Sequence, residues 1–268
     1  MSPELQEPRI FQFLRPEVVE RVAPYQALAE IYDHVMRHVN YRRWASYVKK
    51  IARGAGFRGG RVLDVACGTG NFLGEFVGRD RVAAGCDYSL PMVAIAARKL
   101  RRKKGVLGCW AADMRQLAAR SGWDMVVCLY DSINYLPDLA EYRKFFVEAA
   151  EVLRSGGLLV FDVCTIQNSV INFDGYRERG FAKDKEYVRY SYFDRYTGLQ
   201  VNEFLIGEKG QLERKAALEV HRQWIRPLED ITAAVQRSPF EIVQIYDGFT
   251  NKPGSEASWR VHYLCRKP

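Results

Sequence analysis

The stretch VLDVACGTGNFLG, residues 62–74, decides the fold. It begins as an apolar run with one acid, Asp64, and breaks at Gly68-Thr69-Gly70 before a helical pattern begins. A strand, a glycine loop and a helix in this order open a nucleotide-binding βαβ unit, because bare backbone lets a ligand approach closely. A second apolar run ends at Asp87, where an acid usually holds the hydroxyls of a ribose.

The spacing of the glycines narrows the class of ligand. A dinucleotide fingerprint, G-x-G-x-x-G, has its third glycine beside the pyrophosphate. In this chain Leu73 stands at that position, and Gly74 comes one residue late. A P-loop would need a lysine after the glycines, and none follows. The pattern therefore favours an adenosine ligand without a phosphate, such as S-adenosylmethionine.

Five motifs, in the family's order, resemble the class I S-adenosylmethionine-dependent methyltransferases. They are VLDVACGTGN (62–71), CDYS (86–89), ADM (112–114), VVCLYDSINY (126–135) and LRSGGLLVFD (153–162). The resemblance covers residues 25–165 closely. It implies a Rossmann-like seven-stranded mixed sheet in three αβα layers, with S-adenosylmethionine as cofactor and S-adenosylhomocysteine as product.

The order of apolar patterns agrees with such a sheet. Strands are expected near 61–66, 82–87, 106–111, 124–130, 157–163, 240–246 and 259–265, and helices at 25–39, 41–52, 138–153 and 227–236. Asp138 and Glu141 have the spacing of a helix-capping box. Runs at 186–194, 199–207 and 211–224 predict an antiparallel meander of three strands, because the loops between them are too short for parallel crossovers.

Three parts are expected from this order. Residues 1–55 form an N-terminal helical lid, of which 1–20 are a loose arm or short helix. Residues 56–164 and 225–268 form the Rossmann-like core. Residues 165–224 form an antiparallel β lid inserted after strand five, near the carboxyl ends of the strands where ligands of α/β proteins bind.

The resemblance also implies roles for single residues. Asp64 would face the methionine end of the cofactor, and Asp87 the ribose, since Ser89 is the better cap for the following helix. Asp113 would accept from the adenine amino group beside the Met114 amide; an ordinary helix N-cap is the alternative. The implied cofactor-binding residues are Asp64, Ala66, Gly68, Gly70, Asn71, Asp87, Tyr88, Met92, Asp113, Met114, Leu129, Tyr130, Tyr32, Tyr41 and Trp44. For Met92 and the three N-terminal aromatic residues, packing in the core is the alternative.

The sequence indicates the methyl acceptor less clearly than the cofactor. Enzymes that methylate amino groups of nucleic-acid bases carry [DN]-P-P-[YFW] after strand four, and this chain has YDSI at 130–133. The run resembles small-molecule N-methyltransferases that act on amino sugars, glycine or other amines. Tyr135 and His221 are candidates for substrate contact, and His221 also for a general base, with structural packing as its alternative. His34 and His38 lack a third ligand, so no metal is expected.

Composition excludes several other classes. The formal charge is +8, but its densest cluster, 98–104, follows a helical stretch, where cations suit the negative end of the helix dipole. Nucleic acid is therefore a possible but not a favoured partner. Six cysteines without a C-x-x-C pair indicate a reduced cytoplasmic protein, and no run is long enough to span a membrane. A monomer and a homodimer both remain open.

Three other functions compete with this hypothesis. The chain could methylate RNA or protein through its basic surface, or bind S-adenosylmethionine without catalysis. It could also be a dehydrogenase, in which case it would prefer a nicotinamide cofactor.

Overall fold

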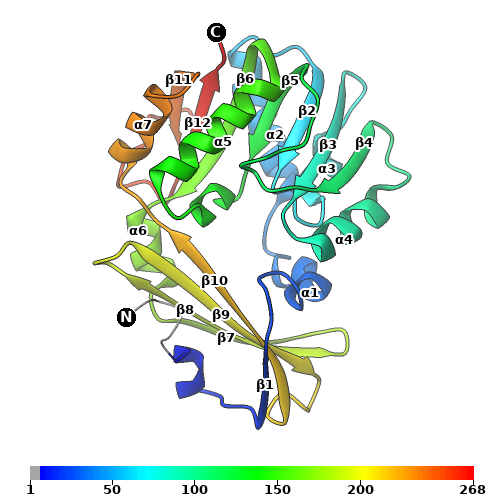
Figure 1. Ribbon diagram of the computed structural model, residues 1–268, viewed down its shortest axis with the longest axis vertical. Coiled ribbons are helices and arrows are strands. Elements are labelled where there is room, and N and C mark those ends of the chain that lie inside the picture. The colour runs from blue at the N-terminus through cyan, green and yellow to red at the C-terminus, as the bar shows by residue number, and fades with distance from the viewer. Residues whose placement is uncertain (1–6) are drawn as a thin grey trace. The chain divides into compact units, whose positions relative to one another are not determined.

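The computed structural model describes residues 7–268 (Figure 1). The chain divides into two compact units. The larger unit comprises residues 39–168 and 224–268, and the smaller unit comprises the chain up to residue 38 together with 169–223. Within the described residues, no helix is long and apolar enough to cross a membrane.

The larger unit contains a seven-stranded mixed sheet, as predicted. The order of its strands is β11-β12-β6-β5-β2-β3-β4. Strands β2 to β6 pair in parallel, and β12 runs antiparallel between β6 and β11. The bounds are β2 (Gly60–Val65), β3 (Arg81–Asp87), β4 (Val106–Ala111), β5 (Trp123–Cys128), β6 (Leu153–Cys164), β11 (Glu241–Asp247) and β12 (Arg260–Arg266). The start of β12 therefore lies at the carboxyl edge of the parallel strands, because Arg260 pairs with Cys164 at the end of β6.

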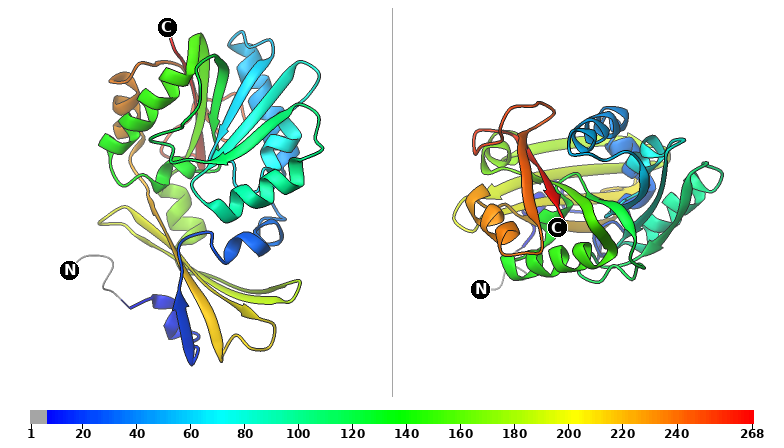
Figure 2. Two further views of the ribbon diagram at one scale, coloured as in Figure 1. Left: turned by 45° about the vertical axis from the view of Figure 1, so that its right-hand side comes forward. Right: turned by 90° about the horizontal axis from the view of Figure 1, so that it is seen from above.

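Helices cover both faces of this sheet (Figure 2). α2 (Tyr41–Gly54) and α3 (Asn71–Phe76) pack on one face, and α5 (Leu139–Val152) and α7 (Leu228–Gln236) on the other. α4 (Leu90–Leu100) follows β3, and the short elements η3 (Ser132–Tyr135) and α6 (Ile166–Asn168) follow β5 and β6. The predicted cap at Asp138 is confirmed, since its Oδ1 accepts the Glu141 N–H at 2.9 Å. The three αβα layers expected from the sequence are confirmed.

The smaller unit is a five-stranded sheet in the order β1-β10-β9-β8-β7. Its strands are β1 (Val18–Arg21), β7 (Tyr176–Ala182), β8 (Lys185–Asp194), β9 (Leu199–Glu208) and β10 (Lys215–Trp224). α1 (Leu28–Val35) packs its apolar side against β7, β8 and β9. The turn η2 (Arg9–Gln12) packs Ile10 into a second cluster with side chains of β8, β9 and β10, and the π-turn η4 (Ser169–Phe173) precedes β7.

The three predicted strands of the meander are confirmed as β8, β9 and β10, but the sheet has two further strands, β7 and β1, that were not predicted. β7 is an exposed edge strand with charged residues at 177–179, so it lacks the apolar alternation that marks a half-buried strand. β1 replaces part of the loose arm or helix expected at 1–20, and it pairs in parallel with β10. Residues 1–6 of that expectation lie outside the described residues. Two predicted bounds also differ from the structure. Residues 211–214 form a turn before β10 instead of its first residues. α1 begins at Leu28 and not at Tyr25, because Tyr25 has a φ of 63°, outside the range of an α-helix.

The units divide the N-terminal segment differently from the predicted lid at 1–55. α1 belongs to the smaller unit, because its apolar residues Leu28, Ile31 and Val35 contact side chains of β7, β8 and β9. α2 belongs to the larger unit, because its apolar face packs directly on the seven-stranded sheet. The division at residues 38 and 39 follows these two separate cores.

Candidate functional site

The glycine loop joins β2 to α3 at the carboxyl edge of the sheet. Ala66, Gly68 and Gly70 all have positive φ, at 58°, 55° and 79°. Glycine adopts this region at little cost, whereas Ala66 stores about 1–3 kcal/mol of backbone strain. A Cβ at Gly70 would lie 2.6 Å from Leu100 Cδ1, so the loop packs tightly on α4. The sequence thus builds a tight turn in which Gly68 and Gly70 carry no side chains.

Asp87 connects this loop to the end of β3. Its Oδ2 accepts the Gly68 N–H and its Oδ1 accepts the Ser89 N–H, each at 2.8 Å. Burial raises the pKa of Asp87, and the two amide bonds oppose part of that increase. Ser89 caps α4, since its Oγ accepts the Met92 N–H at 3.4 Å. The predicted cap at Ser89 is confirmed, whereas the contact between Asp87 and the glycine loop was not predicted.

Asp64 is a buried carboxylate with an unused acceptor. It is 2% exposed, and its Oδ2 has no hydrogen-bond partner among the described residues. Burial holds its pKa well above the usual range, and Cys109 and Asp87 nearby add to the increase. An unpaired buried carboxylate is unfavourable by several kcal/mol in its charged form, so it needs a donor or a cation. The ammonium of S-adenosylmethionine, held beside a glycine loop, fits this unfilled acceptor.

Asp113 follows β4 but already has a partner. Arg115 donates to its Oδ1 through Nε at 2.9 Å and to its Oδ2 through Nη2 at 2.5 Å, which lowers the pKa of Asp113. No helix begins at Asp113, so the alternative of an N-cap was wrong. An adenine amino group would share this carboxylate with Arg115. The Met114 side chain packs against the core between the sheet and α5.

The other predicted residues near α3 and α4 differ in exposure. Tyr88 is 79% exposed. Met92 is 2% exposed and lies in the core, as its packing alternative proposed. Asn71 Oδ1 accepts from Lys99 Nζ at 2.7 Å, which ties the start of α3 to α4.

The loop after β5 is held by a buried carboxylate that the sequence analysis missed. Asp162 of β6 is fully buried, and it accepts the Tyr130 N–H at 2.6 Å and the Asp131 N–H at 3.0 Å. Tyr130 and Asp131 have φ of 63° and 51°, so this anchor fixes two consecutive residues in the left-handed region. A lone acid in the apolar run 157–163, like Asp64 in its own strand, was the available signal. Leu129, which precedes this loop, is buried.

Arg260 of β12 completes this arrangement, and it was also missed. Its guanidinium forms ion pairs with Asp162 and, at 2.6 Å, with Asp131. It also lies 5.3 Å from the Trp44 ring and 5.0 Å from the Tyr130 ring. The charge of Arg260 and burial lower the pKa of the neighbouring His262 to about 3, so this histidine is neutral at physiological pH. Trp44 and Tyr130, both predicted cofactor residues, thus meet at the same edge.

The remaining predicted residues fall in different units. Tyr41 and Tyr135 are half-buried in the larger unit, on α2 and η3. Tyr32 packs within the smaller unit, with its ring 6.0 Å from the Tyr25 ring. Tyr32 thus belongs to the smaller unit, whereas Tyr41 and Trp44 belong to the larger one.

His221 lies on β10 and is almost fully buried in the smaller unit. Its Nε2 is 3.1 Å from Glu219 Oε2, and its ring is 4.6 Å from the Tyr25 ring. Glu219 also accepts the N–H groups of Tyr25 and Leu28, each at 2.8 Å, at the start of α1. These contacts within the unit support the packing alternative for His221. Among the described residues, no group of three or more His, Cys, Asp or Glu side chains could hold a metal ion.

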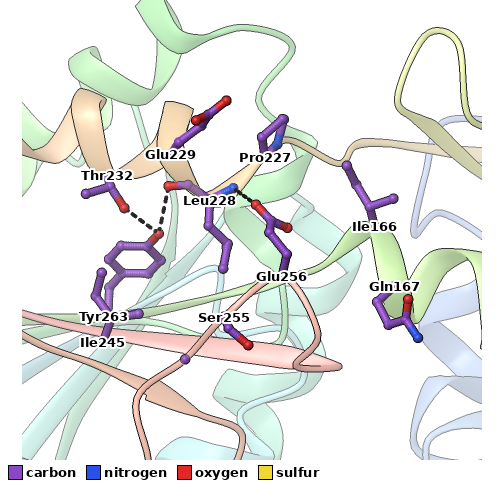
Figure 3. A pocket seen from close by; sticks show the side chains of 11 residues that line it. Ile166, Gln167, Pro227, Leu228, Glu229, Thr232, Ile245, Ser255, Glu256 and Tyr263 are labelled. Carbon is purple, nitrogen blue, oxygen red and sulfur yellow. Dashed lines mark hydrogen bonds between the residues drawn. The ribbon is translucent and has the colours of Figure 1, made fainter.

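A separate pocket of about 740 Å³ lies beside α7 (Figure 3). Leu228 N–H donates to Glu256 Oε1 at 2.5 Å, and the Tyr263 hydroxyl donates to the Leu228 carbonyl at 3.2 Å. Its lining residues come from α6, α7 and the two C-terminal strands with their connection. No residue that the sequence assigned to cofactor or acceptor lines this pocket, so it is distinct from the glycine-loop site.

Comparison with known proteins agrees with this geometry. The family described as "Methyltransferase domain" matches residues 62–157. A Geobacillus sp. (strain WCH70) protein assigned to the methyltransferases is 30% identical over 251 residues, which cover 91% of this chain and 99% of the relative.

Two solved structures are also similar. An S-adenosylmethionine-dependent methyltransferase from Clostridium acetobutylicum ATCC 824 has a TM-score of 0.76 at 23% identity, covering 90% of this chain and 98% of that one. A sugar N-methyltransferase from Streptoalloteichus sp. ATCC 53650 has a TM-score of 0.71 at 26% identity, covering 91% and 95%. The Clostridium acetobutylicum structure shows similarity of fold. The Geobacillus relative shows similarity of sequence as well. Because that sequence similarity runs along nearly the whole chain, the protein belongs to the S-adenosylmethionine-dependent methyltransferases.

Proposed function

We propose that this methyltransferase transfers the methyl group of S-adenosylmethionine to an amine nitrogen of a small molecule. The observation that carries the proposal is its similarity, along 91% of the chain, to a sugar N-methyltransferase at 26% identity. The loop at 130–133 supports it, because YDSI lacks the motif that grips the amino group of a nucleic-acid base.

The residues at the carboxyl edge fit the parts of the cofactor. We infer that Asp64 pairs with the ammonium of its methionine end, and that the backbone at 68–71 meets the carboxylate of that end. Asp87 would bind the ribose hydroxyls through the lone pairs that Gly68 and Ser89 leave open. Asp113 and the Met114 amide would meet the adenine.

The cofactor supplies a methyl group already activated on a sulfonium, so few groups of the protein need act on the reacting atoms. The chain must hold the acceptor nitrogen in line with that methyl group and exclude water. Trp44 and Tyr130 offer apolar surface for this at the edge where β5 ends. The attacking amine must be neutral, and it loses one proton in the course of the reaction.

One alternative gains no specific support. Arg98 and Lys99 lie in the last turn of α4, and the basic residues at 101–104 follow it, where positive side chains stabilise the helix end without a partner. The hypothesis that the protein methylates RNA or protein is therefore supported only by its net positive charge. A cytoplasmic location, a monomeric or dimeric state and a substrate-lid role for the inserted strands stay predictions.

A panel assay tests the proposed acceptor class. The protein is incubated with S-adenosylmethionine and separate sets of amines, nucleotide-linked amino sugars, phenols, RNA and protein. Formation of S-adenosylhomocysteine is measured together with the mass of each acceptor. We expect turnover only in the two amine-bearing sets, with methyl groups on nitrogen. Turnover confined to RNA, protein or phenols would contradict the proposal.

A further inference from the structure

Two cysteines converge on a single glycine beside the glycine loop. Cys67 directly precedes Gly68, and Cys109 lies on β4 as the register partner of Gly85. Side chains of register partners in neighbouring strands point to the same face of the sheet. A Cβ on Gly85 would lie 2.7 Å from Cys67 Sγ, so the Cys67 side chain occupies the space that Gly85 leaves free. The lack of a side chain at residue 85 therefore leaves room for the Cys67 sulfur beside the strand position with which Cys109 is in register.

The two thiols have different environments. Interaction with Cys67 and with the Gly85 backbone lowers the pKa of the half-buried Cys109. Interaction with Cys109 and, to a smaller extent, burial raise the pKa of Cys67. The remaining cysteines are buried, and burial raises the pKa of Cys86, Cys128 and Cys265. Because the thiolate is the reactive form, Cys109 is the thiol best placed to react first.

We propose that Cys67 and Cys109 form a peroxide-sensitive pair, and that the disulfide between them weakens binding of the cofactor. In the first step the Cys109 sulfur attacks a peroxide oxygen. The O–O bond breaks, an S–O bond forms, and the hydroxide leaves with a proton as water. The Cys67 sulfur then attacks the Cys109 sulfur, the S–O bond breaks, and a second water leaves with the Cys67 proton. Two thiols are oxidised and one peroxide is reduced by two electrons.

The disulfide affects the loop because bonded sulfur atoms lie only about 2.05 Å apart, closer than two thiols in contact. Cys67 and β4 must therefore draw together. The next residue, Gly68, is held by Asp87 at 2.8 Å, and Asp64 lies on the other side of Gly85 in the sheet register. A shift of Cys67 thus disturbs the two acids and the backbone that fit the cofactor.

Tryptic peptide mapping tests the linkage directly. Cleavage yields peptides 62–79 and 105–115, and each contains one cysteine of the pair and no other. The reduced full chain is treated with hydrogen peroxide, alkylated and digested without reductant. We expect the two peptides joined by a disulfide in the mass spectrum. Their absence after treatment that oxidises Cys109 to higher acids would overturn the proposal.

Calorimetry with S-adenosylhomocysteine tests the consequence. Oxidation is expected to weaken binding by about tenfold or more, which corresponds to about 1.4 kcal/mol, and dithiothreitol should restore it. Cys109→Ser should bind like the reduced wild type and lose the response to peroxide, with Cys109→Ala as a second variant in case serine perturbs the fold. Cys265→Ala, a matched change of a buried cysteine on β12, should keep the full response. An unchanged affinity in the linked protein, or equal peroxide sensitivity in the Cys109 variants, would refute the proposal.

Discussion

Asp87 combines an observed role in the fold with the proposed role in binding the ribose. Its two oxygen atoms hold the Gly68 and Ser89 amides, which leaves further lone pairs directed at the site. The sequence identified this residue from its place after the second strand. The bond to Gly68 was not predictable, because it depends on where the loop turns after β2.

Replacement of Asp87 by alanine is expected to weaken binding of S-adenosylhomocysteine by about 1.5–3 kcal/mol, the usual contribution of a charged hydrogen bond. Isothermal calorimetry measures the change. Asp138→Ala is the matched control, since Asp138 also accepts a backbone N–H but lies at the start of α5. The control should lose about 1 kcal/mol of stability and no affinity. Equal loss of affinity in both variants would show a general effect on the fold.

Replacement of Asp64 by asparagine is expected to lower ligand affinity but to raise the stability of the ligand-free protein. Asp64→Asn should weaken S-adenosylhomocysteine binding by about 1.5–3 kcal/mol, because the partner of the ligand ammonium loses its charge. In the ligand-free protein the same change should raise the free energy of unfolding by about 1 kcal/mol at neutral pH, because a buried unpaired carboxylate is removed. Calorimetry and urea unfolding measure the two effects.

The pH dependence of this variant follows from the raised pKa of Asp64. The folded protein holds this proton more tightly than the unfolded chain. Wild-type stability therefore falls as pH rises from about 4, where the unfolded carboxyl titrates, through the raised folded pKa. The asparagine variant lacks this loss, so its advantage should be larger at about pH 8 than at about pH 5. An advantage independent of pH would argue against an unpaired carboxylate.

At the scale of elements, three segments meet through one guanidinium. Arg260 links β12 to Asp162 on β6 and to Asp131 in the loop after β5. The two carboxylates are buried, so each needs this charge. The conformation of the loop that carries Tyr130 therefore depends on Arg260, which lies far away in the sequence.

Replacement of Arg260 by methionine is expected to lower the free energy of unfolding by about 3–5 kcal/mol, because two buried carboxylates lose their cation. Urea unfolding measures the loss. Arg154→Met is the control: Arg154 pairs with Asp124 at 2.5 Å but is 57% exposed, and such pairs contribute about 1 kcal/mol or less. Similar losses in the two variants would contradict the role of burial.

At the scale of the whole molecule, ligand binding should stabilise the folded chain by mass action. S-Adenosylhomocysteine at about 100 times its Kd should raise the free energy of unfolding by about 2.7 kcal/mol. Thermal unfolding with either S-adenosylhomocysteine or nicotinamide dinucleotide measures the shift. Only the first should raise the melting temperature. Stabilisation by the dinucleotide alone would favour the dehydrogenase alternative.

The accuracy of the sequence analysis differs between the two units. In the larger unit each strand and helix carries its own periodic pattern, and the motifs follow in a fixed order, so all seven strands were predicted. In the smaller unit β1 and β7 are edge strands with few buried residues. Their pairing depends on neighbours supplied by distant segments, and no local pattern records it.

The sequence by itself determined the βαβ order, the glycine loop, and the acids Asp64 in β2 and Asp87 at the end of β3. These features are local in the chain. Only the tertiary structure decided that Arg260 meets Asp162, 98 residues away, that Cys67 lies beside Gly85, the register partner of Cys109, and that β1 adds to β10. These contacts arise when separate elements pack together. Their energy comes from burial and from pairing across the sheet, which periodicity along the chain does not encode.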